Sequence, residues 1–475
     1  MAENAVNVVA SALQRTPADV LQMIFLFCLP KPKYPGHVTF PRPSTCKAPV
    51  VYSHICRSWR DVALSTPRLW ACLSIPEEFS SSFVVWIKEL LRRSDSLPLY
   101  FQWTRSRKYR QNSRERDTLD QTLIKLLIAE SSRWRAASIG STSAILKQFL
   151  VPLKFGVPML EALKIRETSP GGRFSHIYAL DITAVPHLQY LNVTNECQLT
   201  GLSAKQSLRQ FILKDDGRDS SDWSESFMTP SGILQLFSDC PQLELVDIDI
   251  EWDIQPTPHQ AFMPSLQTLS VGPGSTYTIG PGNPIDIGPP LFQRLTLPAL
   301  RTLSIDLSSE GWGRRSLVSI HSLIGRSHAS LTSLSLYGQR DRQTKWEDDL
   351  IGCILHLPDL KVLSLEDMPT TDKFIIALTY SPHSTGADIL CPVLDQLRFV
   401  ASTFSERKVI DMIRSRWDNA KHPLLLVRFL SCKLSPSGGA DLQSFGKSKL
   451  AKERKLTLMV DIRGASKKII PSKPY

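Results

Sequence analysis

The sequence lacks the features that mark a secreted or membrane protein. No run of 18 apolar residues occurs, so we expect no transmembrane helix. Residues 1–15 lack the basic start and the apolar stretch of a secretory signal. The nine cysteines are an odd number and form no Cys-x-x-Cys pair. This distribution argues against a disulfide framework or a zinc ribbon, and it predicts reduced thiols in the cytosol, the nucleus or both.

Catalytic and cofactor motifs are also absent. The sequence contains no Gly-rich phosphate loop, no Gly-x-Ser-x-Gly and no His-Glu-x-x-His. The ten histidines are dispersed, and His321 and His328 have no acidic or cysteine neighbour that would complete a metal site. We therefore expect a non-catalytic protein without a cofactor or a metal. An enzyme whose pocket forms only in the fold is the least favoured alternative.

What is present is the composition of a folded protein with unevenly distributed charge. Hydrophobic residues make up 42% and charged residues 21% of the 475, and this length predicts several domains or a repeat array. The net charge of +11 would by its sign permit nucleic acid or an anionic membrane as a partner. Most of this charge lies in residues 102–116 and 433–475. We interpret these as a basic loop and a basic C-terminal segment, so nucleic acid is an unfavoured partner and no membrane is expected.

A small helical module is predicted over residues 16–75, after a flexible N-terminus at 1–15. Thr16-Pro17-Ala18-Asp19 is typical of a helix start with Thr16 as the N-cap. A second helix is expected to open near Ala48 and continue to Ala63, and a short third element follows Thr66. The proline-rich stretch 30–47 between the first two is a loop. So much apolar surface on three short helices predicts a module that shares this surface with another structure.

Three strings of this module match a known pattern in the correct order. They are residues 16–25 (TPADVLQMIF), 55–61 (ICRSWRD) and 65–70 (STPRLW). Together they resemble the F-box of many fungal proteins, which runs Leu-Pro-x-Glu-x-Leu-x-x-Ile-Phe, then Val-Cys-Arg-x-Trp-Arg, then Ser-Pro-x-Leu-Trp. Two features depart from it: Arg15-Thr16 stands where the family has Leu before the Pro, and the loop 30–47 is an insertion.

F-box modules bind the adaptor Skp1, which connects them to a cullin-RING ubiquitin ligase. The alternative is that the same apolar side chains pack only against the rest of this chain. The resemblance implies that ten side chains form or support a Skp1-facing surface: Pro17, Val20, Leu21, Ile24, Phe25, Ile55, Cys56, Trp59, Leu69 and Trp70.

The rest of the chain contains an internal repeat, Pro-x-Leu-x-x-Leu-x-aliphatic, seven times with the proline and twice without it. From the first copy to the ninth, 234 residues in eight steps give a mean spacing of about 29, within the range of leucine-rich repeats. The first leucines of the copies are Leu160, Leu188, Leu208, Leu243, Leu266, Leu300, Leu331, Leu360 and Leu394.

This repeat predicts an α/β fold. Leu-x-x-Leu-x-Leu places alternate side chains of a short strand in a core, and the proline ends the preceding helix. We expect linker helices and a helix-strand solenoid with a parallel sheet over residues 76–432. The repeats resemble the irregular leucine-rich repeats that bind substrate in the same fungal proteins. Steps of 20 to 35 residues leave an ordinary α/β domain as the alternative.

Residues between the buried positions of each strand are expected to face outward on the concave side. The early ones are basic and the middle ones acidic, and such a polarised face would orient a partner; a merely solvated face is the alternative. The nine candidates for contact with a protein substrate are Lys164, Arg166, Asn192, Asp247, Asp249, Asp306, Tyr337, Glu366 and Arg398.

With the resemblance, this organisation implies a substrate-recognition adaptor of a Skp1–cullin–F-box ubiquitin ligase. The module would bind Skp1 and the repeats a protein target for ubiquitination. The alternative, from a different class, is a leucine-rich-repeat scaffold or a nucleic-acid-binding protein that is not coupled to ubiquitin transfer.

Overall fold

The chain forms two compact units, residues 1–226 and 227–475. No helix of the described residues is both long and apolar enough to cross a bilayer. The predicted N-terminus 1–15, most of the insertion 30–47 and the centre of the basic loop 102–116 lie outside the described residues. The computed structural model describes residues 16–29, 47–105, 114–168, 178–194, 197–202, 206–214, 228–250, 260–273, 288–307, 316–338, 346–368, 370–380, 390–400, 402–419, 424–432 and 438–462.

The first unit begins with a helical module that has an aromatic core. It consists of α2 (Ala18–Phe27), α3 (Tyr52–Ile55), α4 (Arg57–Leu64) and the 3-10 helix η1 (Pro67–Leu69). The Phe25 ring stacks on Tyr52 with 4.3 Å between centroids and lies 4.9 Å from Trp59. The indole Nε1 of Trp70 donates a 2.8 Å hydrogen bond to the carbonyl of Ala63. This bond fixes the turn after η1 to the C-terminal end of α4, where helix carbonyls need donors.

Two details of this module differ from the sequence prediction. Helix α2 begins at Ala18, and Pro17 rather than Thr16 occupies its N-cap position. The single helix predicted from Ala48 to Ala63 is wrong, because Cys56 has an extended backbone (φ −155°, ψ 173°) that separates α3 from α4. Residues before and after Cys56 therefore do not share one helical face.

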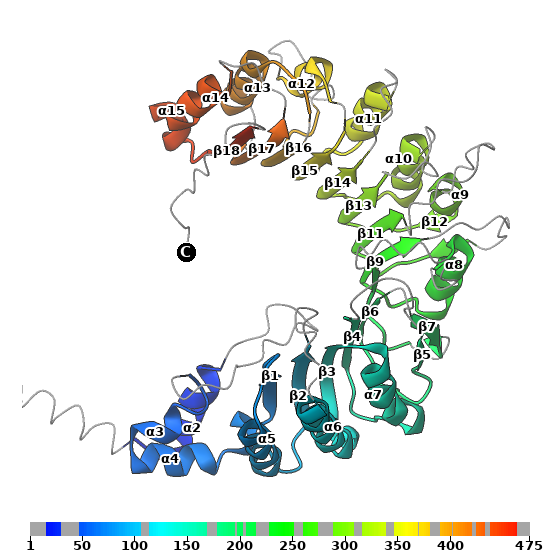
Figure 1. Ribbon diagram of the computed structural model, residues 1–475. Helices are drawn as coiled ribbons and strands as arrows, with labels where there is room; N and C mark the ends of the chain where they lie inside the picture. The colour runs from blue at the N-terminus through cyan, green and yellow to red at the C-terminus, as the bar shows by residue number, and fades with distance from the viewer. Residues whose placement is uncertain are drawn as a thin grey trace, which may run out of the picture. The chain divides into compact units, whose positions relative to one another are not determined.

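The remainder of the first unit is a parallel sheet with a layer of helices. Neighbouring strands pair in the order β1-β2-β3-β4-β6-β8. Figure 1 shows α5 (Ser81–Arg93), α6 (Arg114–Ala129) and α7 (Ser143–Phe155) together on one side of these strands. The short strands β5 (Tyr178–Asp181) and β7 (Cys197–Thr200) pair with each other. The sheet strands are β1 (Cys72–Ile75), β2 (Leu99–Thr104), β3 (Trp134–Ser141), β4 (Ala162–Glu167), β6 (Tyr190–Thr194) and β8 (Gln210–Lys214), with the 3-10 helix η2 (Ser131–Arg133) before β3.

The second unit repeats this plan over eight parallel strands in the order β9-β11-β13-β14-β15-β16-β17-β18. Its helices lie on the outer side of the curved sheet and leave the concave face to the strands (Figure 1). The strands are β9 (Leu245–Ile250), β11 (Thr268–Pro273), β13 (Thr302–Asp306), β14 (Ser333–Tyr337), β15 (Val362–Glu366), β16 (Gln396–Val400), β17 (Leu426–Cys432) and β18 (Thr457–Ile462). The outer layer holds α8 (Pro230–Asp239), α9 (Gly288–Gln293), α10 (Ser316–Ser327), α11 (Trp346–Leu355), α12 (Asp372–Leu378), α13 (Glu406–Asn419), α14 (Gly438–Lys447), α15 (Lys449–Glu453) and the paired short strands β10 (Ala261–Phe262) and β12 (Leu295–Thr296).

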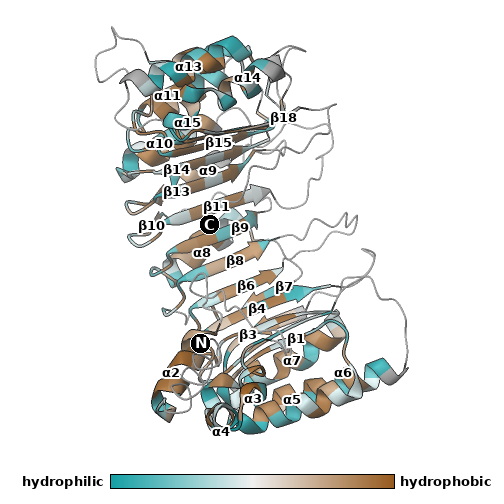
Figure 2. Ribbon diagram, turned by 90° about the vertical axis from the view of Figure 1, so that its left-hand side faces the viewer, coloured by the Kyte–Doolittle hydropathy of each residue, from teal (hydrophilic) through white to brown (hydrophobic). Residues whose placement is uncertain are grey.

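The repeated leucines form the core, as predicted. Leu163, Leu303 and Leu363 are at most 1% exposed, and the residues beside them on each strand alternate to the open face. Burying one such side chain contributes about 1.5–3 kcal/mol. Figure 2 shows the resulting contrast: the strands are mainly hydrophobic, whereas helices such as α13 carry both hydrophobic and hydrophilic residues. The predicted α/β leucine-rich-repeat solenoid with a parallel sheet is therefore confirmed, in two units that are each built this way.

The sheet extends beyond the predicted repeats at both ends. β1, β2 and β3 precede the first predicted copy, and β17 and β18 follow the last one. β18 pairs with β17, so the basic segment predicted to begin at residue 433 contributes two helices and a strand to the second unit. The outer layer is also less uniform than a helix-strand repeat, because β5, β7 and β10 take the place of helices and β12 follows the short helix α9. The 20-residue step from Leu188 to Leu208 is too short for a strand, two turns and a full helix.

Three arginines, of which Arg133 and Arg416 are buried and Arg326 is exposed, connect helices of the outer layer to one another. Arg416 on α13 is 2% exposed and donates to the carbonyls of Leu378, Cys391 and Leu390 at 2.8, 2.9 and 2.6 Å. Arg326 on α10 donates to the carbonyl of Phe292 on α9, and Arg133 donates to that of Leu91 on α5. Each arginine thus supplies a donor to a carbonyl near the C-terminal end of an earlier helix, where unpaired carbonyls and the helix dipole favour a cation.

Carboxylates make the corresponding contact at the other end of these helices. Glu347 on α11, 5% exposed, accepts hydrogen bonds from the backbone N–H groups of Thr371 and Phe374 at 2.9 and 3.1 Å. Asp372 on α12 accepts a bond from the N–H of Ser405 just before α13. The N-terminus of one helix is thus capped by the helix before it.

Candidate interaction surfaces

The ten residues predicted to form or support a Skp1-facing surface divide by burial into three groups. Leu21, Phe25, Leu69 and Trp70 are at most 1% exposed, so they belong to the core of the module and can only support a surface. The exposed ones are Pro17, Ile24 (44%) and Ile55 (54%), and Val20, Cys56 and Trp59 are intermediate.

Three exposed apolar side chains of the module were not among the predicted ten. Phe27 is 71% exposed, Met23 55% and Leu64 37%. Met23, Ile24 and Phe27 lie at positions i, i+1 and i+4 of α2, so they share one face of that helix. We call Met23, Ile24, Phe27, Ile55 and Leu64 the exposed apolar set. Within the first unit, as far as it is described, these side chains keep between 37% and 71% of their surface exposed, which is typical of a surface for a partner.

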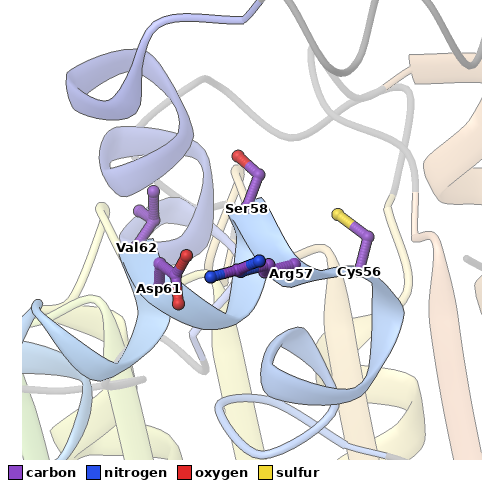
Figure 3. A pocket seen from close by; sticks show the side chains of 5 residues that line it. All are labelled: Cys56, Arg57, Ser58, Asp61 and Val62. Atoms are coloured by element: carbon purple, nitrogen blue, oxygen red, sulfur yellow. The ribbon is translucent and has the colours of Figure 1, made fainter.

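A shallow pocket of about 470 Å³ lies on α4 of the same module. Cys56, Arg57, Ser58, Asp61 and Val62 line it, and Figure 3 shows the Arg57 side chain extending toward Asp61. One thiol, one hydroxyl and one pair of opposite charges do not form a nucleophile-base arrangement of the kind that catalysis requires. This pocket is therefore a polar part of the module's surface.

The concave face of the first unit has a basic centre, as expected. Lys164 pairs in register with Asn192 on β6, and Arg166 lies two residues further along β4. Desolvation, and then the neighbouring Arg166, lower the pKa of Lys164. The Asn192 side chain donates to the hydroxyl of Tyr190 at 3.0 Å, so its amide is oriented by its own strand.

The concave face of the second unit carries a row of side chains in exact register from strand to strand. We call this the central row. It begins with an acidic residue, continues with four serines and ends with two arginines and a methionine: Asp247, Ser270, Ser304, Ser335, Ser364, Arg398, Arg428 and Met459.

Beside this row the structure brings three predicted residues together. Asp306, Tyr337 and Glu366 are register partners on β13, β14 and β15. Arg398 Nη1 lies 2.9 Å from Glu366 Oε1, and Ser364 Oγ donates to the same oxygen at 3.3 Å. A hydrogen bond to Glu366 and the charge of that carboxylate raise the pKa of Tyr337. Arg398 and Tyr337 keep substantial exposure, with 41% of the Arg398 side chain and 45% of Tyr337 open.

Asp249 was expected on the open surface and is instead buried, at 8% exposure. Asp247 on the same strand is half-buried. The expected exposure is therefore wrong for Asp249 and only partly present for Asp247, and their contact with a substrate stays a prediction. The prediction also missed Arg428, although Pro423-Leu424-x-x-Val427-x-Phe429 repeats the pattern of the other strands and identifies it as outward-facing.

No candidate metal centre occurs in the described part of the chain: no group of three or more His, Cys, Asp or Glu side chains is arranged to hold an ion. His321 does not meet His328; its ring packs on His356 with 4.6 Å between centroids.

Comparison with known proteins leaves the F-box resemblance resting on the three strings of the sequence. No family model matches the chain, and no curated protein matches it. Among solved structures, the chain is similar to TLR13 in its complex with ssRNA13, with 14% identity and a TM-score of 0.34. The match covers 70% of this chain and 43% of that one, so it spans less than half of the length of the TLR13 chain.

Proposed function

We propose that this protein is a substrate-recognition adaptor of a Skp1–cullin–F-box ubiquitin ligase. The helical module binds Skp1, and the repeats bind a protein target that the ligase ubiquitinates. The chain supplies no catalytic residue in this mechanism. It raises the effective concentration of target lysines near the ubiquitin-transferring subunits. Such an adaptor would act in the cytoplasm, the nucleus or both.

The observation that carries the proposal is the exposed apolar set on the helical module. Phe27 and Met23 are the kind of large side chains that a folded module buries when it can. Here the core positions of the same helix, Leu21 and Phe25, are already packed inside the module. The face of α2 that carries Met23 and Phe27 is therefore exposed and apolar, although the core of the module is already packed. Protein-protein interfaces have this arrangement.

The two faces of α2 have different roles in the proposal. Phe25 contacts Tyr52 and Trp59, so the motif residues Phe25 and Trp59 shape the module. Ile24 and Phe27 are open and would contact Skp1 directly. The match to the F-box pattern thus contains fold residues and contact residues side by side on one helix.

The test is co-expression of the full chain with Skp1, followed by affinity purification. We expect Skp1 to co-purify with the native chain and to be lost with Phe27→Asp and with Ile24→Asp. An aspartate at an apolar contact would lose its water in the complex without gaining a partner for its charge. This weakens the binding free energy by about 2 kcal/mol or more, which lowers the retention of Skp1 at least about thirtyfold.

Phe155→Asp is the matched control. Phe155 lies at the end of α7 in the same unit and is 84% exposed, against 71% for Phe27, so both changes place a carboxylate on an open phenylalanine position. Retention of Skp1 by Phe155→Asp together with its loss from Phe27→Asp supports the proposed interface. Equal retention by Phe27→Asp and the native chain would contradict it, and failure of the native chain to capture Skp1 would contradict the ligase assignment itself.

A further inference from the structure

Two arginines lie side by side at one end of the central row of the second unit. Arg398 on β16 and Arg428 on β17 are register partners on adjacent parallel strands. Neighbouring strands are about 4.8 Å apart, so the two guanidinium groups project from nearly the same place. Both residues are half-buried, and each lies between two buried residues of its strand, so they face away from the core that the helices cover.

The described residues do not satisfy the donors of this pair. Glu366 engages Nη1 of Arg398. No described carboxylate forms an ion pair with Arg428, and the Nε atoms of both arginines are buried without an acceptor. A guanidinium has five N–H donors in a planar fork that fits an oxyanion in two-point contact. The pair therefore offers an oxyanion more donors than the protein itself uses.

The local charge selects among oxyanions. Two arginines and Glu366 sum to +1, which one carboxylate neutralises. A phosphate carries about −1.5 to −2 at neutral pH and would leave negative charge beside Glu366. Further along the face the formal charges are acidic, with Asp306 beside the row and Asp247 at its start. An anionic group is thus favoured at β16–β17 and disfavoured toward β9.

We propose that Arg398 and Arg428 bind the carboxylate of an aspartate or glutamate in an extended segment of the partner protein. This inference rests on the proposed function, in which the repeats hold a protein target, and it assigns that target's recognition chemistry. Tyr337, two strands from Arg398 and 45% exposed, supplies an aromatic contact near the same place. Tyrosine and arginine are the side chains that most often dominate such interfaces.

The experiment uses the full chain and fluorescein-labelled peptide pools. Each peptide has about nine residues, because six strand spacings of about 4.8 Å from β9 to β17 span about 29 Å. One pool has Glu fixed at a central position and uncharged residues elsewhere, and the others have Gln, Lys or phosphoserine at that position. Fluorescence anisotropy measures binding. We expect the Glu pool to bind roughly tenfold more tightly than the Gln pool, and the Lys pool most weakly.

Arg428→Gln is the decisive variant, because Arg428 has no ion pair with the described residues whose loss would disturb the fold. It should remove most of the preference for Glu over Gln. Arg407→Gln is the matched control, since Arg407 is an exposed arginine on α13 of the same unit, on the helix side. It should leave the preference unchanged. Unaltered thermal unfolding measured by circular dichroism confirms that both variants are folded.

Two results would overturn the inference. Equal binding of the Glu and Gln pools by the native chain would show that the arginines do not recognise a carboxylate. Tighter binding of the phosphoserine pool, lost in Arg428→Gln, would assign the pair to a phosphorylated segment instead. Skp1 capture does not involve Arg428, so either result with Skp1 capture intact refutes this inference and leaves the ligase assignment standing.

Discussion

Arg416→Met is the substitution that best tests how the repeats are held together. Arg416 is 2% exposed, and its three hydrogen bonds end on carbonyls of Leu378, Cys391 and Leu390. These carbonyls belong to the end of α12 and to the segment before β16. Methionine fills a similar volume but has no donor, so the change removes the bonds and the buried charge with little loss of packing.

Two opposing effects set the magnitude. Burial lowers the pKa of Arg416 from 12.5 to about 10, so the cost of burying the charge is about 3 kcal/mol at neutral pH. Three hydrogen bonds to a charged donor contribute about 1.5–3 kcal/mol each, or about 4–9 kcal/mol together. The bonds exceed the desolvation cost. We expect Arg416→Met to destabilise the second unit by about 3 kcal/mol.

Hydrogen exchange of the full chain measures this locally, because a long repeat protein need not unfold in one step. Amides of α12 and α13 should exchange roughly a hundredfold faster in Arg416→Met, the equivalent of about 3 kcal/mol. Arg407→Met, an exposed change on the same helix, should alter exchange by less than about 0.5 kcal/mol. Native-like protection in Arg416→Met would refute the reasoning, because it would mean that desolvation offsets all three bonds.

Two further predictions concern buried polar groups of the same unit. Glu347→Ala leaves the N–H groups of Thr371 and Phe374 without their acceptor. We expect it to lower the stability of the first turn of α12 by about 2 kcal/mol, measured as faster hydrogen exchange there. Asp349→Ala, a change at an exposed position of α11, should leave this exchange unchanged. Burial raises the pKa of the Cys353 and Cys391 thiols from 9.0 to about 12. Because the unfolded thiols ionise first, stability should fall as pH rises from about 9 to 12. A thiol reagent at neutral pH should modify exposed Cys28 in the native protein but reach Cys353 and Cys391 only after unfolding, and their rapid modification in the native state would contradict this burial.

Much of the solenoid could be predicted because its core is local in sequence. Leucines spaced as Leu-x-x-Leu-x-Leu must alternate on a strand, and Leu303, Leu334 and Leu363 do so in register. The strands that were missed use other residues for the same purpose. β2 buries Phe101 and Trp103 where other strands bury leucines, and β3 buries Ala137 and Ile139. A pattern written in leucines does not detect an aromatic or alanine version of the same alternation.

The outer layer could not be predicted in the same way. Whether a helix or a pair of short strands covers the sheet depends on the length between strands and on contacts with the neighbouring repeat. The break at Cys56 is a further example, because nothing in Ile55-Cys56-Arg57 is a helix-breaking residue. Such features are decided by tertiary contacts, which override weak local propensity.

For the interaction surfaces, sequence identified the elements better than the individual residues. The F-box-like strings located the helical module, yet the most exposed side chains on α2, Phe27 and Met23, lay outside the predicted set. The ten predicted positions include residues that pack in the core of the module and residues that lie on its surface. Exposure separates the two groups, and exposure follows from the packing of Phe25 on Tyr52 and Trp59 rather than from α2 alone.

The arginines show the same separation most clearly. In the sequence, Ser415 and Trp417 flank Arg416, and Val427 and Phe429 flank Arg428, and neither setting states whether the donors of the arginine are satisfied. In the structure, three carbonyls satisfy Arg416 in the interior. Arg428 lies half-open beside Arg398 with no carboxylate of the described residues as its partner. A buried arginine whose three nitrogens all donate to carbonyls stabilises the fold, whereas an arginine with unused donors on an open sheet face is available to a ligand. Arg416 therefore belongs to the fold, and Arg428 is available for recognition.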